Sequence, residues 1–165
     1  MAYRNKTYII FDGDNDMWAY AYMKGWNNSR HIDFDFYDAH DIQKMPRAQD
    51  EAYVKSILSQ RLANTKQAVV LCGAKTKNLF RFVRWEIETC INKGIPIVVA
   101  NLNKKRSFDG DLCPSILNGA GAMHVEFGAR IIKFALENYA EDPTEYKSNK
   151  NWYYADDIYK NLGYD

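Results

Sequence analysis

Short apolar segments alternate with amphipathic segments along most of the chain, and this alternation limits the possible folds more than any other feature. An apolar segment such as "AVVLCG" (68–73), closed by Gly, is typical of a buried parallel strand. Strands are expected at residues 8–11, 32–38, 68–73, 95–102 and 123–127, and helices at residues 15–26, 48–64, 78–94 and 129–140. Because parallel strands need right-handed helical crossovers, the pattern predicts an α/β, flavodoxin-like, doubly wound domain. Its central parallel sheet should have about five strands in the order 2-1-3-4-5.

The composition fits a folded domain without a strongly charged partner. Of 165 residues, 47% are hydrophobic and 15% aromatic, which excludes general disorder. Lys and Arg number 22 against 21 acidic residues, so no overall field would attract nucleic acid or an anionic membrane, and neither is expected as a partner. The N-terminus lacks the apolar region of a signal peptide, and no apolar run approaches ~20 residues, so a cytoplasmic location is expected. Cys72, Cys90 and Cys113 have no CxxC spacing and are expected to be reduced and structural.

Three acidic residues follow the first predicted strand, where a doubly wound sheet binds its ligands. Asp12-Gly13-Asp14 resembles the opening motif of the haloacid dehalogenase phosphatases, in which one Asp attacks phosphorus. Asp16, however, stands where that motif has Thr or Val, and Cys72-Gly73 follows the next central strand in place of Ser or Thr. A receiver domain would need an acceptor Asp after the third strand, which Cys72-Gly73 also lacks. No metal site is therefore predicted, and a Mg²⁺-dependent phosphatase stays a third alternative.

Two later segments resemble a known family. "DFDFYDAHD" (33–41) and "TKNLFRFVRWEIE" (76–88) are similar to the TIR-like (Toll/interleukin-1 receptor-like) family, in particular to sensor proteins of Thoeris anti-phage systems. "GIPIVVANLN" and "LCPSIL" continue the resemblance, which covers about residues 5–140. The chain departs from the family after the first strand, where Phe11-Asp12-Gly13-Asp14 replaces a Phe-Ile-Ser-Tyr type sequence. A TIR-like domain is expected at 1–140, and the aromatic-rich extension at 141–165 is expected to pack on the domain or on a partner.

The resemblance implies an activity. Family members cleave NAD⁺, as a substrate and not a cofactor, at the nicotinamide–ribose bond, and one helix glutamate is essential; it maps to Glu86. Defence members make a cyclic ADP-ribose-type signal that reaches a separate effector by diffusion, and self-association into a homo-oligomer is expected. Helical spacing puts Glu86 at the edge of an apolar stripe and not fully buried, beside the cleft, with Glu88 on the opposite, solvated flank. An ordinary helix carboxylate, paired with Arg81 or Arg84, is the alternative for Glu86.

The remaining candidates come from the loops that follow the strands. The predicted substrate-binding residues are Phe11, Asp12, Gly13, Asp14, His40, Asp41, Cys72 and Gly73. The acids after the first strand could equally cap the next helix, and His40 could be a solvated loop residue. Phe82 and Trp85 are predicted to form an exposed aromatic pair on the helix surface, and hence an interface. The second functional hypothesis is a non-catalytic TIR-like module that works by assembly.

Overall fold

A central, fully parallel sheet organises the chain. The computed structural model describes residues 5–28, 34–79, 81–140 and 150–165. The strands are β1 (Asn5–Ile10), β2 (Phe34–Tyr37), β3 (Gln67–Cys72), β4 (Ile97–Asn101), β5 (Met123–Glu126) and β6 (Trp152–Tyr153). They lie in the order β2-β1-β3-β4-β5-β6, and each neighbouring pair is parallel. The predicted fold class is confirmed, with six strands in the described sheet instead of about five.

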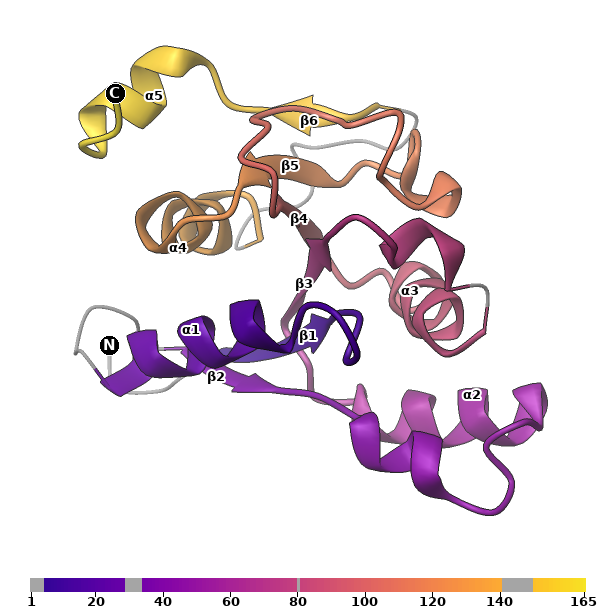
Figure 1. Cartoon of the computed structure of the whole chain (residues 1–165). Coiled ribbons are helices and arrows are strands. Elements are labelled where there is room, and N and C mark those ends of the chain that lie inside the picture. Colours follow the sequence, from indigo (N-terminus) through magenta and orange to yellow (C-terminus); the bar gives the residue numbers. More distant parts are fainter. Residues whose placement is uncertain (1–4, 29–33, 80, 141–149) are drawn as a thin grey trace.

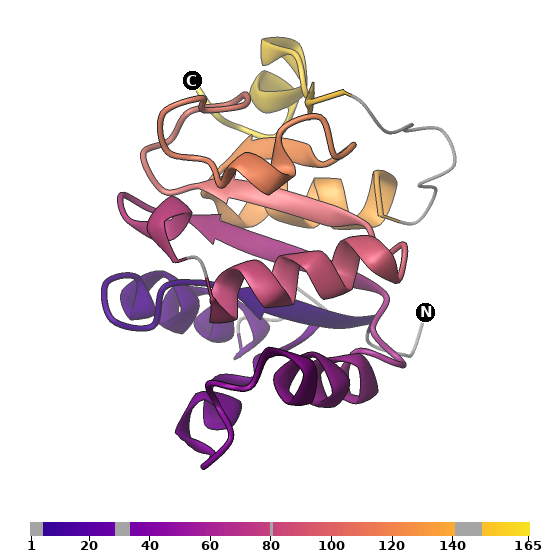
Figure 2. The ribbon, with the colours of Figure 1, turned by 90° about the vertical axis from the view of Figure 1, so that its right-hand side faces the viewer.

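Helices cover both faces of this sheet. The α-helices are α1 (Met17–Asn28), α2 (Glu51–Arg61), α3 (Phe82–Asn92), α4 (Ala129–Asn138) and α5 (Asp156–Asn161), and short 3₁₀ helices are η1 (His40–Lys44), η2 (Thr76–Asn78) and η3 (Ser115–Leu117). Helices α1 and α4 lie on one face and α2 and α3 on the other (Figure 1). Figure 2 shows α2 and α3 from the front, with the sheet behind them.

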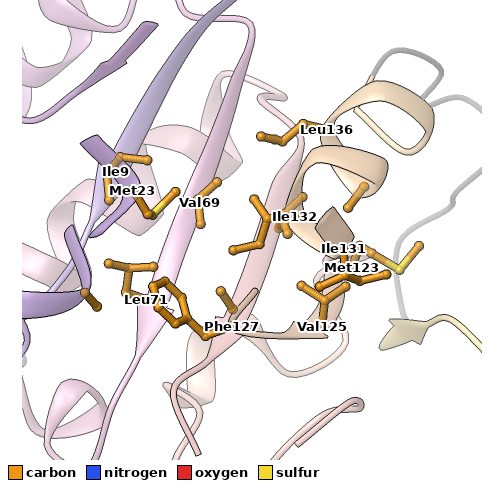
Figure 3. Packing of buried hydrophobic residues seen from close by; sticks show 14 of the residues in the cluster. Ile9, Met23, Val69, Leu71, Met123, Val125, Phe127, Ile131, Ile132 and Leu136 are labelled. Atoms are coloured by element: carbon orange, nitrogen blue, oxygen red, sulfur yellow. The ribbon is translucent and has the colours of Figure 1, made fainter. Parts of the chain in front are cut away.

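Alternating strand side chains produce two cores, one on each face. Ile9, Val69 and Leu71 belong to the core under α1 and α4, together with Ile132 and Leu136 of α4 (Figure 3). The side chains between them, such as Tyr8 and Val70, belong to the core under α2 and α3. Because both faces are covered, β3, β4 and β5 are buried along their whole length. This explains why these strands are continuous apolar runs in the sequence.

The C-terminal residues join the same sheet. Trp152 and Tyr153 of β6 pair with Met123 and His124 of β5, and the ring of Tyr159 on α5 is fully buried in the α4-side core. No strand is predicted here from the sequence, because a two-residue segment is too short to show alternation. The predicted division at residue 140 stays a prediction. Residues 32–33 of the second predicted strand, Phe80 and residues 141–149 of the extension lie outside the described residues.

Candidate functional site

A cavity of about 760 Å³ opens at the carboxyl edge of the sheet. Its walls come from the loop after β1 and the first residue of α1, from η1, and from the segment that runs from the end of η2 into the start of α3. The lining residues are Phe11, Asp12, Gly13, Asp14, Met17, His40, Gln43, Lys44, Asn78, Leu79, Arg81, Phe82 and Val83. Its size is that of a small-molecule site, for which about 300–1,000 Å³ is usual. The structure therefore brings five of the predicted substrate-binding residues, Phe11 to Asp14 and His40, to one cavity, but not Asp41, Cys72 or Gly73.

The two acids in the first-strand loop have different surroundings. Asp12 is 3% exposed, and its carboxylate accepts hydrogen bonds from the backbone N–H groups of Asp14 and Asn15, at 3.0 and 3.3 Å, and from Asn15 Nδ2 at 2.7 Å. Asp12 thus holds the turn that leads into α1. The side chain of Asp14 is exposed and takes no hydrogen bond or ion pair within the described residues. Asp14 therefore presents a free negative charge at the cavity.

The ring of His40 forms the aromatic part of the wall. It packs on Phe11, with 4.5 Å between the ring centroids, and its Nδ1 lies 3.8 Å from Asp38 Oδ2. Its Nε2 is buried without a hydrogen-bond partner among the described residues. A Cβ atom added at Gly13 would lie 2.4 Å from this nitrogen, so only glycine leaves room for the ring. Gly13 and His40 thus determine each other's position.

Asp41 is directed away from the cavity. Arg61 of α2 donates to both of its carboxylate oxygens, with 2.6 Å between Arg61 Nη1 and Asp41 Oδ1. The hydrogen bond from Arg61 lowers the pKa of Asp41. This ion pair ties η1 to α2, so the residue has a local structural function in this conformation.

Gly73 and Cys72 lie at the end of β3, below the first-strand loop. A Cβ atom at Gly73 would lie 2.2 Å from Asp16 Oδ2, so the backbone and this carboxylate are in close contact. Burial, and then the charge of nearby Asp12, raise the pKa of Asp16. The thiol of Cys72 donates to the carbonyl of Leu112 at 3.3 Å, and a hydrogen bond with Cys113 followed by burial raises its pKa. Neither Cys72 nor Gly73 lines the cavity: Gly73 contacts Asp16 at the end of the first-strand loop, and Cys72 contacts Leu112.

Glu86 lies inside the α3-side core, one helical turn after Val83 of the cavity wall. It is 2% exposed, which corrects the expectation of a partly exposed group at the edge of the apolar stripe. The Tyr8 hydroxyl donates a hydrogen bond to Glu86 Oε2, and Oε1 has no partner among the described residues. Burial raises the pKa of Glu86 well above 4.5; the Tyr8 hydrogen bond lowers it in part, and the charge of Asp38 raises it further. Glu86 does not line the cavity in this conformation.

The expectation of an exposed aromatic pair on α3 is wrong for Trp85. Trp85 is 6% exposed, whereas Phe82 is half-buried and lines the cavity. The reason is that α3 is covered by α2 as well as by the sheet. Lys55 of α2 contacts Glu88, one turn after Trp85, at 2.6 Å, and Arg84 Nε contacts the other oxygen of Glu88 at 2.8 Å. Glu88 is therefore ion-paired and half-buried instead of solvated, and its partner Arg84 is not available to Glu86.

Several residues at the site were missed by sequence reasoning. Tyr8, Gln43, Lys44, Asn78 and Arg81 contact Glu86 or line the cavity. Tyr8 offered one signal, because it is a hydroxyl-bearing residue in an otherwise apolar strand. The others are ordinary surface residue types, and only the fold brings them together.

Neither a metal cluster nor a membrane helix is found in the described part of the chain. No group of three or more His, Cys, Asp or Glu side chains there could hold a metal ion. No helix in the same residues is long and apolar enough to cross a membrane.

The comparison with known families identifies one family model. The family model for the TIR-like domain of the Thoeris protein ThsB matches residues 8–107. That range contains the last three residues of β1, all of β2, β3 and β4, every residue that lines the cavity, and Glu86. No curated protein matches the chain at a significant level. Because the family model covers more than half of the 165 residues, the chain belongs to the Thoeris ThsB TIR-like domain family.

Proposed function

We propose that this protein is a cytoplasmic enzyme of a Thoeris-type defence system, which cleaves NAD⁺ and makes a cyclic ADP-ribose-type signal for a separate effector. The cavity at the carboxyl edge receives the dinucleotide, and Glu86 is the catalytic carboxylate. Membership of the ThsB TIR-like family supports the defence context and implies that the protein works with other partners. NAD⁺ is a substrate in this proposal, and no bound cofactor or metal takes part.

One observation carries the enzymatic proposal: Glu86 is a buried carboxyl group with a raised pKa and an unsatisfied oxygen, next to a cavity. A buried polar atom without a partner is unfavourable, and such groups are concentrated at functional sites. The free energy of folding would be more favourable with an apolar or fully hydrogen-bonded residue here. A scaffold without catalysis has no need of this group.

The chemistry requires a negative charge at this place. When the C1′–N bond of NAD⁺ breaks, its electron pair goes to the nicotinamide nitrogen, and positive charge develops on the ribose ring, as in glycoside cleavage. The ionised Glu86 carboxylate stabilises this charge. Water then attacks C1′ and loses a proton to give ADP-ribose, or a hydroxyl group of the same molecule attacks to give a cyclic product. The Tyr8 hydroxyl keeps the carboxylate oriented through its hydrogen bond to Oε2.

Catalysis in this scheme requires a conformational change. Glu86 is closed off from the cavity, whose wall contains Phe82 and Val83 of the preceding helical turn. A movement of η1 or of the start of α3 would open a path between the carboxylate and the bound ribose. The closed conformation then represents a resting protein, and an infection signal or self-association produces the active one.

The test is to express the protein with and without phage infection and to analyse the nucleotides by mass spectrometry. We expect NAD⁺ to fall and a cyclic ADP-ribose-type product to appear in infected cells with the wild-type protein. Glu86→Gln should abolish both changes, and Glu88→Gln, the matched substitution two residues away, should leave both in place. Normal product formation by Glu86→Gln would overturn the proposal.

A second candidate function, assembly without catalysis, is favoured by one surface of α1. Met17, Trp18 and Tyr22 are large hydrophobic residues that are 47, 49 and 62% exposed. Exposed apolar side chains that lie together on one helix face indicate an interaction surface, whereas single exposed apolar residues are common on any protein. In this alternative, Trp18→Ser and Tyr22→Ser abolish defence, whereas Glu86→Gln retains it.

A further inference from the structure

The cavity has walls of opposite charge. Asp12 and Asp14 lie on the side formed by the loop after β1. Lys44 is the last residue of η1, and Arg81 directly precedes α3, so both cations come from the other two segments. The amide side chains of Gln43 and Asn78 accompany the cations. A ligand that carries one positive and one negative end fits such a cavity in one orientation.

The two cations are free to bind a ligand. Among the described residues, Lys44 and Arg81 take part in no ion pair or side-chain hydrogen bond, and Asp14 has none on the opposite side. Other basic residues of the same region are engaged: Lys55 with Glu51 and Glu88, and Arg61 with Asp41. Lys44, Arg81 and Asp14 thus keep charges that are available to a ligand at the cavity, while Lys77, which is exposed and also without an ion pair among the described residues, lies outside it.

We infer that the cavity binds the dinucleotide in a defined orientation, with its diphosphate at Lys44 and Arg81 and its pyridinium ring at Asp14. This inference rests on the proposed function, because it takes a nicotinamide dinucleotide as the ligand. The planar guanidinium group of Arg81 donates paired hydrogen bonds to phosphate oxygens, and Lys44 adds a point charge. The pyridinium ring carries positive charge, so it favours the carboxylate of Asp14 and the aromatic wall of Phe11 and His40. The reacting ribose then lies between the two charged walls. Phe82 and Val83 also line the cavity, and they belong to the helical turn that precedes Glu86.

ADP-ribose tests the diphosphate contacts separately from the pyridinium contacts, because it keeps the diphosphate but lacks the pyridinium ring. Isothermal titration calorimetry of the full chain with ADP-ribose should give a Kd that rises about tenfold or more in Arg81→Gln and in Lys44→Gln. Lys77→Gln removes an exposed cation that lies close in the chain but outside this cavity, and it should leave the Kd unchanged. Equal weakening by all three substitutions would show a general charge effect and overturn the subsite.

Asp14→Asn tests the pyridinium end. We expect it to weaken binding of NAD⁺ but to leave binding of ADP-ribose unchanged or slightly tighter, because the removed carboxylate repels the diphosphate. Weaker binding of both ligands, to the same degree, would overturn the orientation.

Binding and turnover are measured separately. A wild-type protein that binds both ligands as expected but never consumes NAD⁺ would refute the enzymatic proposal and leave the subsite intact. If the wild-type protein cleaves NAD⁺, and Arg81→Gln and Lys44→Gln cleave it with the same KM as the wild type, the subsite alone is refuted.

Discussion

The hydroxyl group of Tyr8 on β1 donates a hydrogen bond to the carboxylate of Glu86 on α3, across 78 residues of sequence. Both side chains are buried, at 0 and 2% exposure. The pKa of the Tyr8 hydroxyl is raised by burial and then by the charge of Glu86, so Tyr8 stays protonated and remains a donor. This contact is the only hydrogen bond to the Glu86 side chain among the described residues, and the behaviour of the carboxyl group depends on it.

Replacing Glu86 by Gln should reduce NAD⁺ turnover by about 10²–10³-fold or more, since one preorganised charge near the reacting centre is lost. The variant keeps the size of the side chain and its ability to accept from Tyr8. Glu88→Gln is the control: its ion pairs with Lys55 and Arg84 are partly exposed, and it should keep full activity. Turnover is measured in extracts of infected cells. Loss of activity in both variants, with unfolding, would indicate that the helix matters only for structure.

The activity should fall on the acid side at a pH above the ordinary range of a glutamate. Burial raises the pKa of Glu86, so the ionised form that stabilises the ribosyl cation appears only as the pH rises through this higher value. Tyr8→Phe removes the hydrogen bond that lowers the pKa, so the acid limb of kcat/KM should move to still higher pH. A pH profile of kcat/KM for both proteins checks this. An unchanged limb in Tyr8→Phe would mean that another group titrates.

The stability of the wild type relative to Glu86→Gln should decrease as the pH rises. The folded-state pKa of Glu86 lies above the unfolded value of 4.5, so the folded protein retains the proton that the unfolded chain loses. The contribution of this group is therefore fully present below pH 4.5 and is lost as the pH rises through the folded-state pKa, at about 1.4 kcal/mol per pH unit. Glu86→Gln lacks this dependence. Urea denaturation at a series of pH values gives the free energy of unfolding of both proteins. The difference between them should be constant below pH 4.5 and should shift in favour of the variant as the pH rises above 4.5. A difference that stays constant at every pH would contradict a raised pKa.

Chelation of divalent cations should leave NAD⁺ consumption unchanged, because the departure of nicotinamide depends on the carboxylate and not on a Lewis acid. The measurement is turnover in active extract before and after dialysis against EDTA. Activity that disappears with the chelator and returns with Mg²⁺ would instead revive the phosphatase hypothesis suggested by Asp12-Gly13-Asp14.

Gly13→Ala should displace His40 and destabilise the protein by about 1–3 kcal/mol, since the new Cβ would lie 2.4 Å from the imidazole Nε2. Binding of NAD⁺ should weaken, because Phe11, His40 and Gly13 line the side of the cavity that is assigned to the pyridinium ring. Gly25→Ala is the matched control: Gly25 lies within α1 with nothing within 4 Å of the added Cβ. It should stabilise the protein by about 0.5–1 kcal/mol through helix propensity. Thermal unfolding and titration of both variants check this, and a neutral Gly13→Ala would show that His40 moves freely.

The fold could be predicted from the sequence because its signals are local. Buried parallel strands such as β3 and β4 are short apolar runs, and in the helices between them apolar residues recur at helical spacing. The alternation of these strands and helices along the chain defines the doubly wound sheet. The position of the loop after β1 followed from the same rule, since ligands bind at the carboxyl edge of such a sheet. Phe11, Asp12 and Asp14 were predicted from this position and His40 from its place after the second strand, and all four line the cavity.

The orientation of α3 and the basic wall were decided by tertiary structure. The apolar stripe of a helix shows where one neighbour packs, but α3 has two, and α2 buries the side of Trp85 that the stripe left outside. Glu86 accepts a hydrogen bond from Tyr8, a residue of β1 that the periodicity of α3 cannot reveal. Lys44 and Arg81 are separated by three elements of the chain, α2, β3 and η2, and meet only because η1 and the start of α3 border the same cavity. Periodicity describes one element at a time, whereas burial, pKa and charge at a site are sums over every element that packs there.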